Sequence, residues 1–266
     1  MIGIGSGLFK TAMTLSGRFI PSTLFSNGEQ GAWFDPSDLS SMFQLSDGTT
    51  AAAVDSPVGY IRDKSGNGNN AIQATSNKRP TLRQADGLYY LDFDGGQGLQ
   101  VASLDLTATD ELTHFTGHTK TASTENALLL EHSSSAVNEN GTFAVSAPQN
   151  STNHYLIAAR GTVRSSDAVT SATYAGAFTG VTTVTADISG DLIVGRINGT
   201  EVVRDTGNMG DGNFADEPFN IGARNAGATL QFTGFLYQLL VRGKVSSTSE
   251  IADTEQYIAN KTGVSL

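Results

Sequence analysis

The stretch GFLYQLLVRG, residues 234–243, decides the fold class of this chain. Its aromatic and aliphatic residues favour a β-strand, and a glycine bounds it at each end. With a period of two, Phe235, Tyr237, Leu239 and Val241 face one side, and Leu236, Gln238, Leu240 and Arg242 face the other. Because both faces are largely apolar, we expect this strand in the centre of a sheet.

Strand patterns of the same kind recur along the chain before that stretch. LYYLDFD at 88–94 alternates apolar and polar residues, and LIVGRI and TEVVRD flank Asn198-Gly199, a strong hairpin signal because a type I′ turn needs positive φ at both positions. Further candidate strands are 112–120, 127–131, 142–145, 155–159, 180–188 and 218–223. About a dozen short strands with turn residues between them predict an all-β, antiparallel jelly-roll sandwich.

The C-terminal segment predicts the one helix of the chain. Ser247 and Glu250 have the spacing of a capping box, and Gly263 follows Lys261 as a stop signal. We therefore expect a helix over 248–262, with a narrow apolar face that lies on the domain as a clasp.

The N-terminal segment, residues 1–31, differs from the rest of the chain. It is rich in glycine and contains one acid, Glu29, whereas the whole chain has a net charge of -10. Lys10 and Arg18 interrupt its apolar residues, so it does not resemble a cleaved secretory signal. Such an arm either packs on its own domain, assigned to 32–266, or docks into a partner. The candidate anchoring residues are Ile2, Ile4, Leu8, Phe9, Lys10, Arg18 and Phe19.

Composition excludes several classes of function. The chain has no cysteine, which excludes disulfides, thiol nucleophiles and thiolate metal sites. The net charge of -10 disfavours nucleic-acid binding, because phosphate contacts rely on Lys and Arg. No apolar run reaches about 18 residues, so we expect no membrane insertion.

Three stretches together resemble a known family. Residues 31–39 (GAWFDPSDL) and 60–71 (YIRDKSGNGNNA) are similar to the opening of concanavalin A-like, laminin-G-type jelly-roll domains, with their D-x-S-G-N-G-N turn. Residues 79–81 and 91–95 resemble the variant of this domain in virion proteins of tailed bacteriophages, and 220–263 fits the same pattern. The resemblance spans about 31–266 and implies a jelly roll in a phage particle.

Two oxygen-rich loops are candidate binding sites. In the first, Asp63, Ser65, Asn67 and Asn69 alternate as in the start of a calcium loop, with Gly68 sixth. The twelfth position is Ala74 in place of the bidentate Glu, so the alternative is a turn whose side chains bond its own backbone. Calcium is the one candidate ion, and no cofactor is required.

The second loop follows residue 204. Asp205, Asn208, Asp211 and Asn213 offer oxygens beside the ring of Phe214, which suits sugar hydroxyls or calcium. The alternative is a solvated loop, because Asp, Asn and Gly are common in turns for local reasons.

Catalytic patterns are missing from the sequence. Jelly-roll glycosidases carry E-x-D-x-x-E on one strand, and here the acid pairs Asp110-Glu111 and Asp216-Glu217 are adjacent, so on a strand they face opposite sides. His114 and His118 lie about 13 Å apart on a strand, too far to share a zinc ion. Trp33 is better explained as a core residue than as a sugar platform. We therefore expect a protein that is not an enzyme.

These observations lead to one functional hypothesis and two alternatives. The hypothesis is a structural protein of a phage virion, in a head or tail fibre, spike or decoration, whose lectin-like domain binds host cell-surface polysaccharide. The arm docks on a capsid or tail protein, and weak sugar sites favour a homo-oligomer, a trimer, at the particle surface. The alternatives are a glycan-degrading enzyme on a jelly-roll fold and a decoration protein that binds no glycan.

Overall fold

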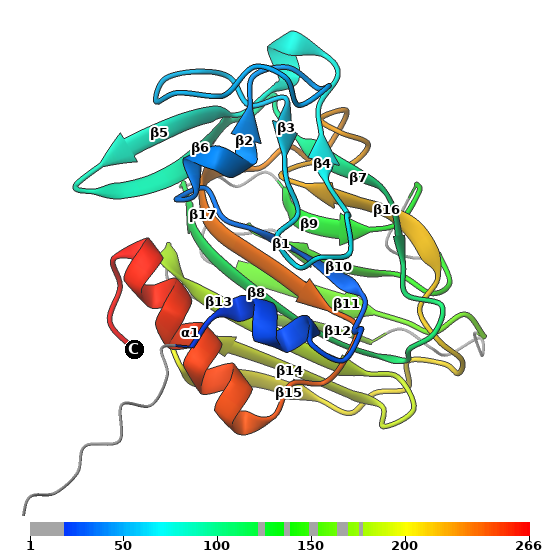
Figure 1. Ribbon diagram of the computed structural model, residues 1–266. Coiled ribbons are helices and arrows are strands. Elements are labelled where there is room, and N and C mark those ends of the chain that lie inside the picture. The colour runs from blue at the N-terminus through cyan, green and yellow to red at the C-terminus, as the bar shows by residue number, and fades with distance from the viewer. Residues whose placement is uncertain (1–18, 122–125, 136–138, 149–153, 164–169, 176–177) are drawn as a thin grey trace, which may run out of the picture.

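The computed structural model describes residues 19–121, 126–135, 139–148, 154–163, 170–175 and 178–266 (Figure 1). Two antiparallel β-sheets form a sandwich, and one α-helix ends the chain. The predicted all-β sandwich with a C-terminal helix is therefore confirmed. In the described part of the chain, no helix combines the length and apolarity needed to cross a membrane.

The first sheet has eight strands and carries the helix on its outer face. Its order is β15-β14-β13-β8-β17-β6-β5, and β1 also pairs with β17. The strands are β1 (Gly31–Phe34), β5 (Thr81–Ala85), β6 (Leu88–Asp94), β8 (Glu111–Lys120), β13 (Thr179–Asp187), β14 (Leu192–Ile197), β15 (Thr200–Asp205) and β17 (Thr233–Arg242). The strand predicted to be central, β17, lies between β8 and β6, as expected.

The second sheet has nine strands in the order β12-β11-β10-β9-β16-β7-β4-β3-β2. They are β2 (Met42–Phe43), β3 (Tyr60–Ile61), β4 (Ala71–Ile72), β7 (Leu99–Asp105), β9 (Leu128–His132), β10 (Phe143–Ser146), β11 (His154–Ala159), β12 (Thr170–Ala175) and β16 (Asp216–Ile221). The four predicted strands in this sheet, β9, β10, β11 and β16, are found within two residues of their expected ends, whereas β2, β3, β4, β7 and β12 were not predicted.

The predicted alternation along β17 is wrong. Leu236, Leu239 and Val241 all join the core between the sheets, which strict alternation from Leu236 does not allow. The cause is a β-bulge between Leu236 and Gln238 in the pairing with β8, because an extra residue on one strand reverses the faces that follow.

The outer face of the first sheet is covered by two helices (Figure 1). The α-helix α1 (Thr248–Thr262) and the short 3-10 helix η1 (Pro21–Phe25) lie on it. Together with Trp33, Phe115, Val181 and Leu240 of the sheet, they form a second apolar cluster. Trp33 is 5% exposed, which confirms its predicted role in the core.

The ends of α1 match the sequence signals. Ser247 accepts from the backbone N–H of Glu250 and the Glu250 carboxylate accepts from that of Ser247, so the capping box is formed. Gly263 ends the helix at φ 75. Close to the C-terminal end of α1, a Cβ on Gly117 of β8 would lie 2.3 Å from Thr262 Oγ1, so the glycine permits a close approach of helix and strand.

The N-terminal segment from Pro21 onward packs on the sandwich. Leu24 and Phe25 are buried in the outer apolar cluster. Glu29 is ion-paired at 2.8 Å to the buried Arg242 of β17, which also contacts Glu250 of α1 at 3.0 Å. The anchoring candidates Ile2, Ile4, Leu8, Phe9, Lys10 and Arg18 lie outside the described residues.

Candidate functional site

The first predicted site, the loop after β3, uses its polar side chains for hydrogen bonds within the protein. The Asp63 carboxylate accepts from the backbone N–H groups of Trp33 (2.9 Å), Ser65 (2.8 Å) and Asn69 (2.9 Å), and from the Ser65 hydroxyl at 2.7 Å. The loop's amide side chains point the same way, because Asn67 and Asn69 donate to the Gly31 carbonyl at 3.1 and 2.8 Å. These hydrogen bonds agree with the alternative interpretation, in which the side chains of the turn bind backbone groups and no metal ion.

Calcium binding by that loop stays a prediction. Asp63 is buried, and its two oxygens already accept four hydrogen bonds from the protein. In the part of the chain that the structure describes, no group of three or more His, Asp or Glu side chains is placed to hold a metal ion.

The second predicted site, residues 205–214, is divided by the fold. Phe214 is fully buried and packs edge-on against Phe143 of β10 at 5.8 Å, so its assignment to a sugar site is wrong. Phe214 is the apolar residue through which this Asp- and Asn-rich loop packs on the core. Asn213 is used internally as well, because its side chain donates to the Thr107 carbonyl at 2.7 Å.

Three members of the second site remain near the surface. Asp205 accepts from the Gly207 N–H at 2.6 Å and Asn208 from the Gly210 N–H at 2.7 Å, as turn residues do. Asp211 is exposed, and its backbone pairs with Val163. Without the ring of Phe214, this loop offers polar groups and no aromatic face.

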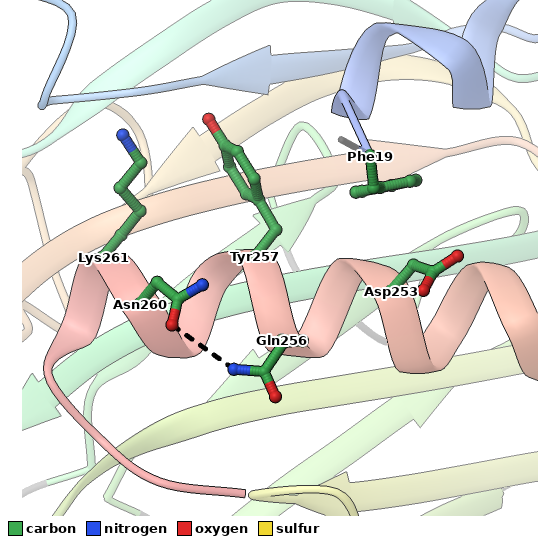
Figure 2. A pocket seen from close by; sticks show the side chains of 6 residues that line it. All are labelled: Phe19, Asp253, Gln256, Tyr257, Asn260 and Lys261. Carbon is green, nitrogen blue, oxygen red and sulfur yellow. Dashed lines mark hydrogen bonds between the residues drawn. The ribbon is translucent and has the colours of Figure 1, made fainter. Parts of the chain in front are cut away.

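A hollow beside the helix brings rings and polar groups together. Figure 2 shows the outer side of α1, where a hollow of about 210 Å³ lies between the helix and Phe19. Its lining residues are Phe19, Asp253, Gln256, Tyr257, Asn260 and Lys261. Five of them lie three to four positions apart along the helix, and this spacing places side chains on one face.

Contacts with the sandwich hold Tyr257 in place. Its ring meets the rings of Phe19 and Trp33 edge-on, with centroids 6.3 and 6.4 Å away. Its hydroxyl donates to Asp35 Oδ2 at 3.3 Å. The partly exposed ring is therefore preorganised by groups from two other segments of the chain, Phe19 and residues 33–35.

The hollow has several exposed polar side chains. Asp253, Gln256 and Asn260 are exposed, and Gln256 donates to Asn260 at 3.3 Å. The Lys261 ammonium donates to Ser37 Oγ at 2.6 Å and lies 5.5 Å from the Tyr257 ring centroid. Carboxylate, amide and ammonium groups around a ring suit non-covalent recognition of a polar ligand.

Sequence reasoning missed this site. The polar residues Asp253, Gln256 and Asn260 repeat on one helical face, which was a readable signal. The approach of Phe19 to that face depends on η1 folding against the first sheet, and no local pattern encodes such a contact.

A row of polar side chains lies on the inner face of β8, between the sheets. His114, Thr116, His118 and Lys120 are all buried, and His118 Nε2 lies 2.9 Å from the Tyr155 hydroxyl of β11. Burial lowers the pKa of His114 to about 3, of His118 to about 4 and of Lys120 to about 8. Both histidines are therefore neutral at pH 7.

Comparisons with known proteins identify the fold and no family. No model of a protein family matches the sequence, and no curated protein matches it. Among solved structures, the chain is similar to an arabinofuranosidase complexed with arabinofuranosyl-alpha-1,2-xylobiose (TM-score 0.59, 13% identity, 92% of this chain and 65% of that one). It is also similar to the binding domain of botulinum neurotoxin serotype G, with a TM-score of 0.54 and 10% identity over 74% of this chain and 48% of that one.

A third solved structure belongs to a botulinum neurotoxin type C whose ability to enter cells depends on interaction with two ganglioside molecules. Its TM-score is 0.51 at 12% identity, over 74% of this chain and 49% of that one. This chain thus spans about half the length of the neurotoxin chains and 65% of the arabinofuranosidase. At these identities the similarity establishes the jelly-roll β-sandwich and leaves the function to be argued from the site.

Proposed function

We propose that this protein is a carbohydrate-binding jelly-roll domain, not an enzyme, and that it binds host cell-surface polysaccharide for a tailed-phage particle. The observation that carries the proposal is the hollow beside α1, where a fixed tyrosine ring lies among exposed amide and carboxylate groups. A sugar presents apolar C–H faces and hydroxyls that both donate and accept, so it can use each of these groups.

The size of the hollow fits a weak, local contact. About 210 Å³ is below the roughly 300–1,000 Å³ of pockets that enclose drug-sized ligands, so it accommodates about one sugar unit. A single shallow site of this kind binds weakly, and useful adhesion then needs several sites presented together. This argument supports the homo-oligomer, a trimer, at the particle surface.

The solved structures support glycans as the ligand class. The arabinofuranosidase holds an arabinofuranosyl-xylobiose, and the type C neurotoxin interacts with gangliosides. The phage setting is supported by the sequence resemblance of residues 79–81, 91–95 and 220–263 to phage virion domains. In this proposal the N-terminal arm supplies the contact with a capsid or tail protein.

One observation favours a second candidate, a glycan-degrading enzyme. The arabinofuranosidase aligns with 92% of this chain. An assay for new reducing ends on host capsule or lipopolysaccharide separates the two functions. Soluble reducing ends released by the purified protein would overturn the binding proposal, and binding without release supports it.

The binding site is tested with surface variants and a glycan array. Asn260→Ala and Gln256→Ala each remove hydrogen-bonding groups from the hollow, and we expect each to weaken glycan binding about three- to tenfold. Asp211→Ala, an exposed change in the loop after β15, is the matched control and should leave binding unchanged.

The same array decides among the remaining interpretations. Loss of binding in Asp211→Ala alone would place the site in the loop after β15 and overturn the assignment to α1. Failure of the wild-type protein to bind any glycan, with particles that lose stability when they lack it, would favour the decoration protein.

A further inference from the structure

A second hollow adjoins the first along the end of α1. It measures about 340 Å³ and is lined by Ser37, Gly87, Leu88, Tyr89, Asn260 and Lys261. Asn260 and Lys261 line both hollows, so a ligand that extends from one to the other passes the Lys261 ammonium. In Figure 2, Tyr257 lies between Lys261, which lines both hollows, and Phe19, which lines the first hollow alone.

Lys261 has no direct ion-pair partner at this junction among the described residues. Among the described residues, no carboxylate oxygen lies within 4.0 Å of its Nζ, in contrast to Lys64 and Lys244. It donates to Ser37, which in turn donates to Asp35 at 2.6 Å, and Asp35 shares Lys64, 3.6 Å away, with Asp38. Two of the three N–H donors of the ammonium thus remain for a ligand.

The two hollows differ in charge. Asp253 lines the first hollow, and no carboxylate is among the residues that line the second. A carboxylate on the ligand is repelled by Asp253 and attracted by Lys261, so it is favoured in the second hollow. A neutral sugar fits the first, where Asp253 accepts hydrogen bonds from hydroxyls.

We propose that the two hollows bind consecutive units of an acidic polysaccharide, with a carboxylated sugar against Lys261 and a neutral sugar against Tyr257 and Asp253. This inference rests on the proposed glycan binding and adds the chemical class and the direction of the chain. The Coulomb attraction is partly exposed to solvent, and binding should therefore weaken as salt rises.

The test uses matched pairs of glycans, each acidic glycan beside the same glycan after reduction of its carboxyl groups to hydroxymethyl groups. We expect the wild-type protein to prefer the acidic member by about tenfold, because reduction removes the carboxylate that the Lys261 ammonium binds through a charge-assisted hydrogen bond. Lys261→Gln should lose this preference and keep the affinity for the reduced member, whereas Lys261→Arg should keep the preference. Lys244→Gln is the control, since it removes a lysine away from both hollows.

Each outcome has a distinct meaning. Equal binding of the acidic and reduced glycans by the wild-type protein would overturn this inference and leave glycan binding intact. A preference that survives in Lys261→Gln, with an unchanged melting temperature, would also overturn it. Absence of binding to every glycan would overturn the proposed function itself.

Discussion

The two faces of strand β8 are both buried, yet they are built from different chemistry. The outer face packs Phe115 and Gly117 against α1, where the helix lies against the strand. The inner face, between the sheets, carries His114, Thr116, His118 and Lys120. The helix therefore covers the apolar outer face of this strand, and the second sheet covers the polar side chains of its inner face.

This difference separates two kinds of sensitivity. The outer layer depends on shape, because a glycine sets the distance between helix and strand. The inner layer depends on charge, because His114 Nε2, His118 Nδ1 and Lys120 Nζ have no hydrogen-bond partner among the described residues. A buried imidazole or ammonium without these partners is more stable in its neutral form than in its charged form.

Acid should have the largest effect, through the inner layer. Burial holds the pKa of His114 at about 3 and that of His118 at about 4, and it holds the pKa of His132, a buried histidine of β9 in the second sheet, at about 4, all below the ordinary 6.5. The unfolded chain therefore binds more protons below pH 6.5, and each histidine costs about 2 kcal/mol at pH 5. Three such costs approach the whole stability of a domain, about 5–15 kcal/mol.

Urea unfolding at pH 7, 6 and 5 measures this loss. His118→Gln removes one titrating group, and its stability should fall less steeply with pH than that of the wild-type protein, by about 1.4 kcal/mol per pH unit. Equal stability of the wild-type protein at pH 7 and pH 5 would show that the inner layer is not charge-sensitive.

Gly117→Ala should have the next largest effect, through the outer layer. The added Cβ would lie 2.3 Å from Thr262 Oγ1 and 2.6 Å from Ile258 Cγ2, which forces the helix away from β8. We expect a loss of about 1–3 kcal/mol, as for overpacked cores, measured by chemical unfolding. Gly96→Ala, whose Cβ meets no atom within 4 Å, is the control. If Gly117→Ala is as stable as this control, the contact between helix and strand can accommodate an added methyl group without loss of stability.

Glu29→Gln should have a smaller effect, because Arg242 keeps its contact with Glu250. Burial raises the pKa of Glu29, but hydrogen bonds from Arg242 and Asn27 outweigh it and hold the pKa at about 2. The carboxylate thus contributes stability above pH 4.5 that is lost as pH falls toward 2. At pH 7 we expect a loss of about 1–2 kcal/mol, below the roughly 3–5 kcal/mol of an orphaned buried charge.

The same variant sharpens the comparison of the layers. Since Glu29 belongs to the outer layer, the decline of stability between pH 7 and pH 5 should be the same in Glu29→Gln and in the wild-type protein. A flatter decline in the variant would show that the two layers titrate together.

Lys120→Met should have the smallest effect, and it should be stabilising. Burial lowers the pKa of Lys120 to about 8, and its ammonium lies 3.9 Å from the Tyr155 ring centroid. Methionine keeps the length of the side chain without the desolvated charge, so we expect a gain of about 1 kcal/mol, or about 2–4 °C in melting temperature. A fall in melting temperature would assign the ring contact a net stabilising role.

Local signals were sufficient for the parts of the fold that are locally determined. The helix boundaries followed from Ser247, Glu250 and Gly263, and the Asn198-Gly199 turn has the positive φ values that its sequence requires. The faces of β17 could not be predicted, because a bulge forms against a partner strand more than a hundred residues away.

The candidate site was less predictable for a related reason. Phe214 and Tyr257 are both aromatic residues among polar neighbours, and burial in the core decides that the first is structural. The second becomes a site residue because Phe19, from the opposite end of the chain, packs beside it. A sequence reports which groups are present, and the tertiary fold selects which of them meet.

The position of β17 has a consequence for how this protein is made. The strand that joins β8 to β6 ends at residue 242 of 266, and the helix that covers the first sheet is synthesised after it. A nascent chain therefore carries open strand edges and an uncovered apolar face until β17 and α1 have both been synthesised. The sandwich closes as a late, concerted event, and ribosomes that stall before this strand release a product that is a substrate for chaperones and prone to aggregation.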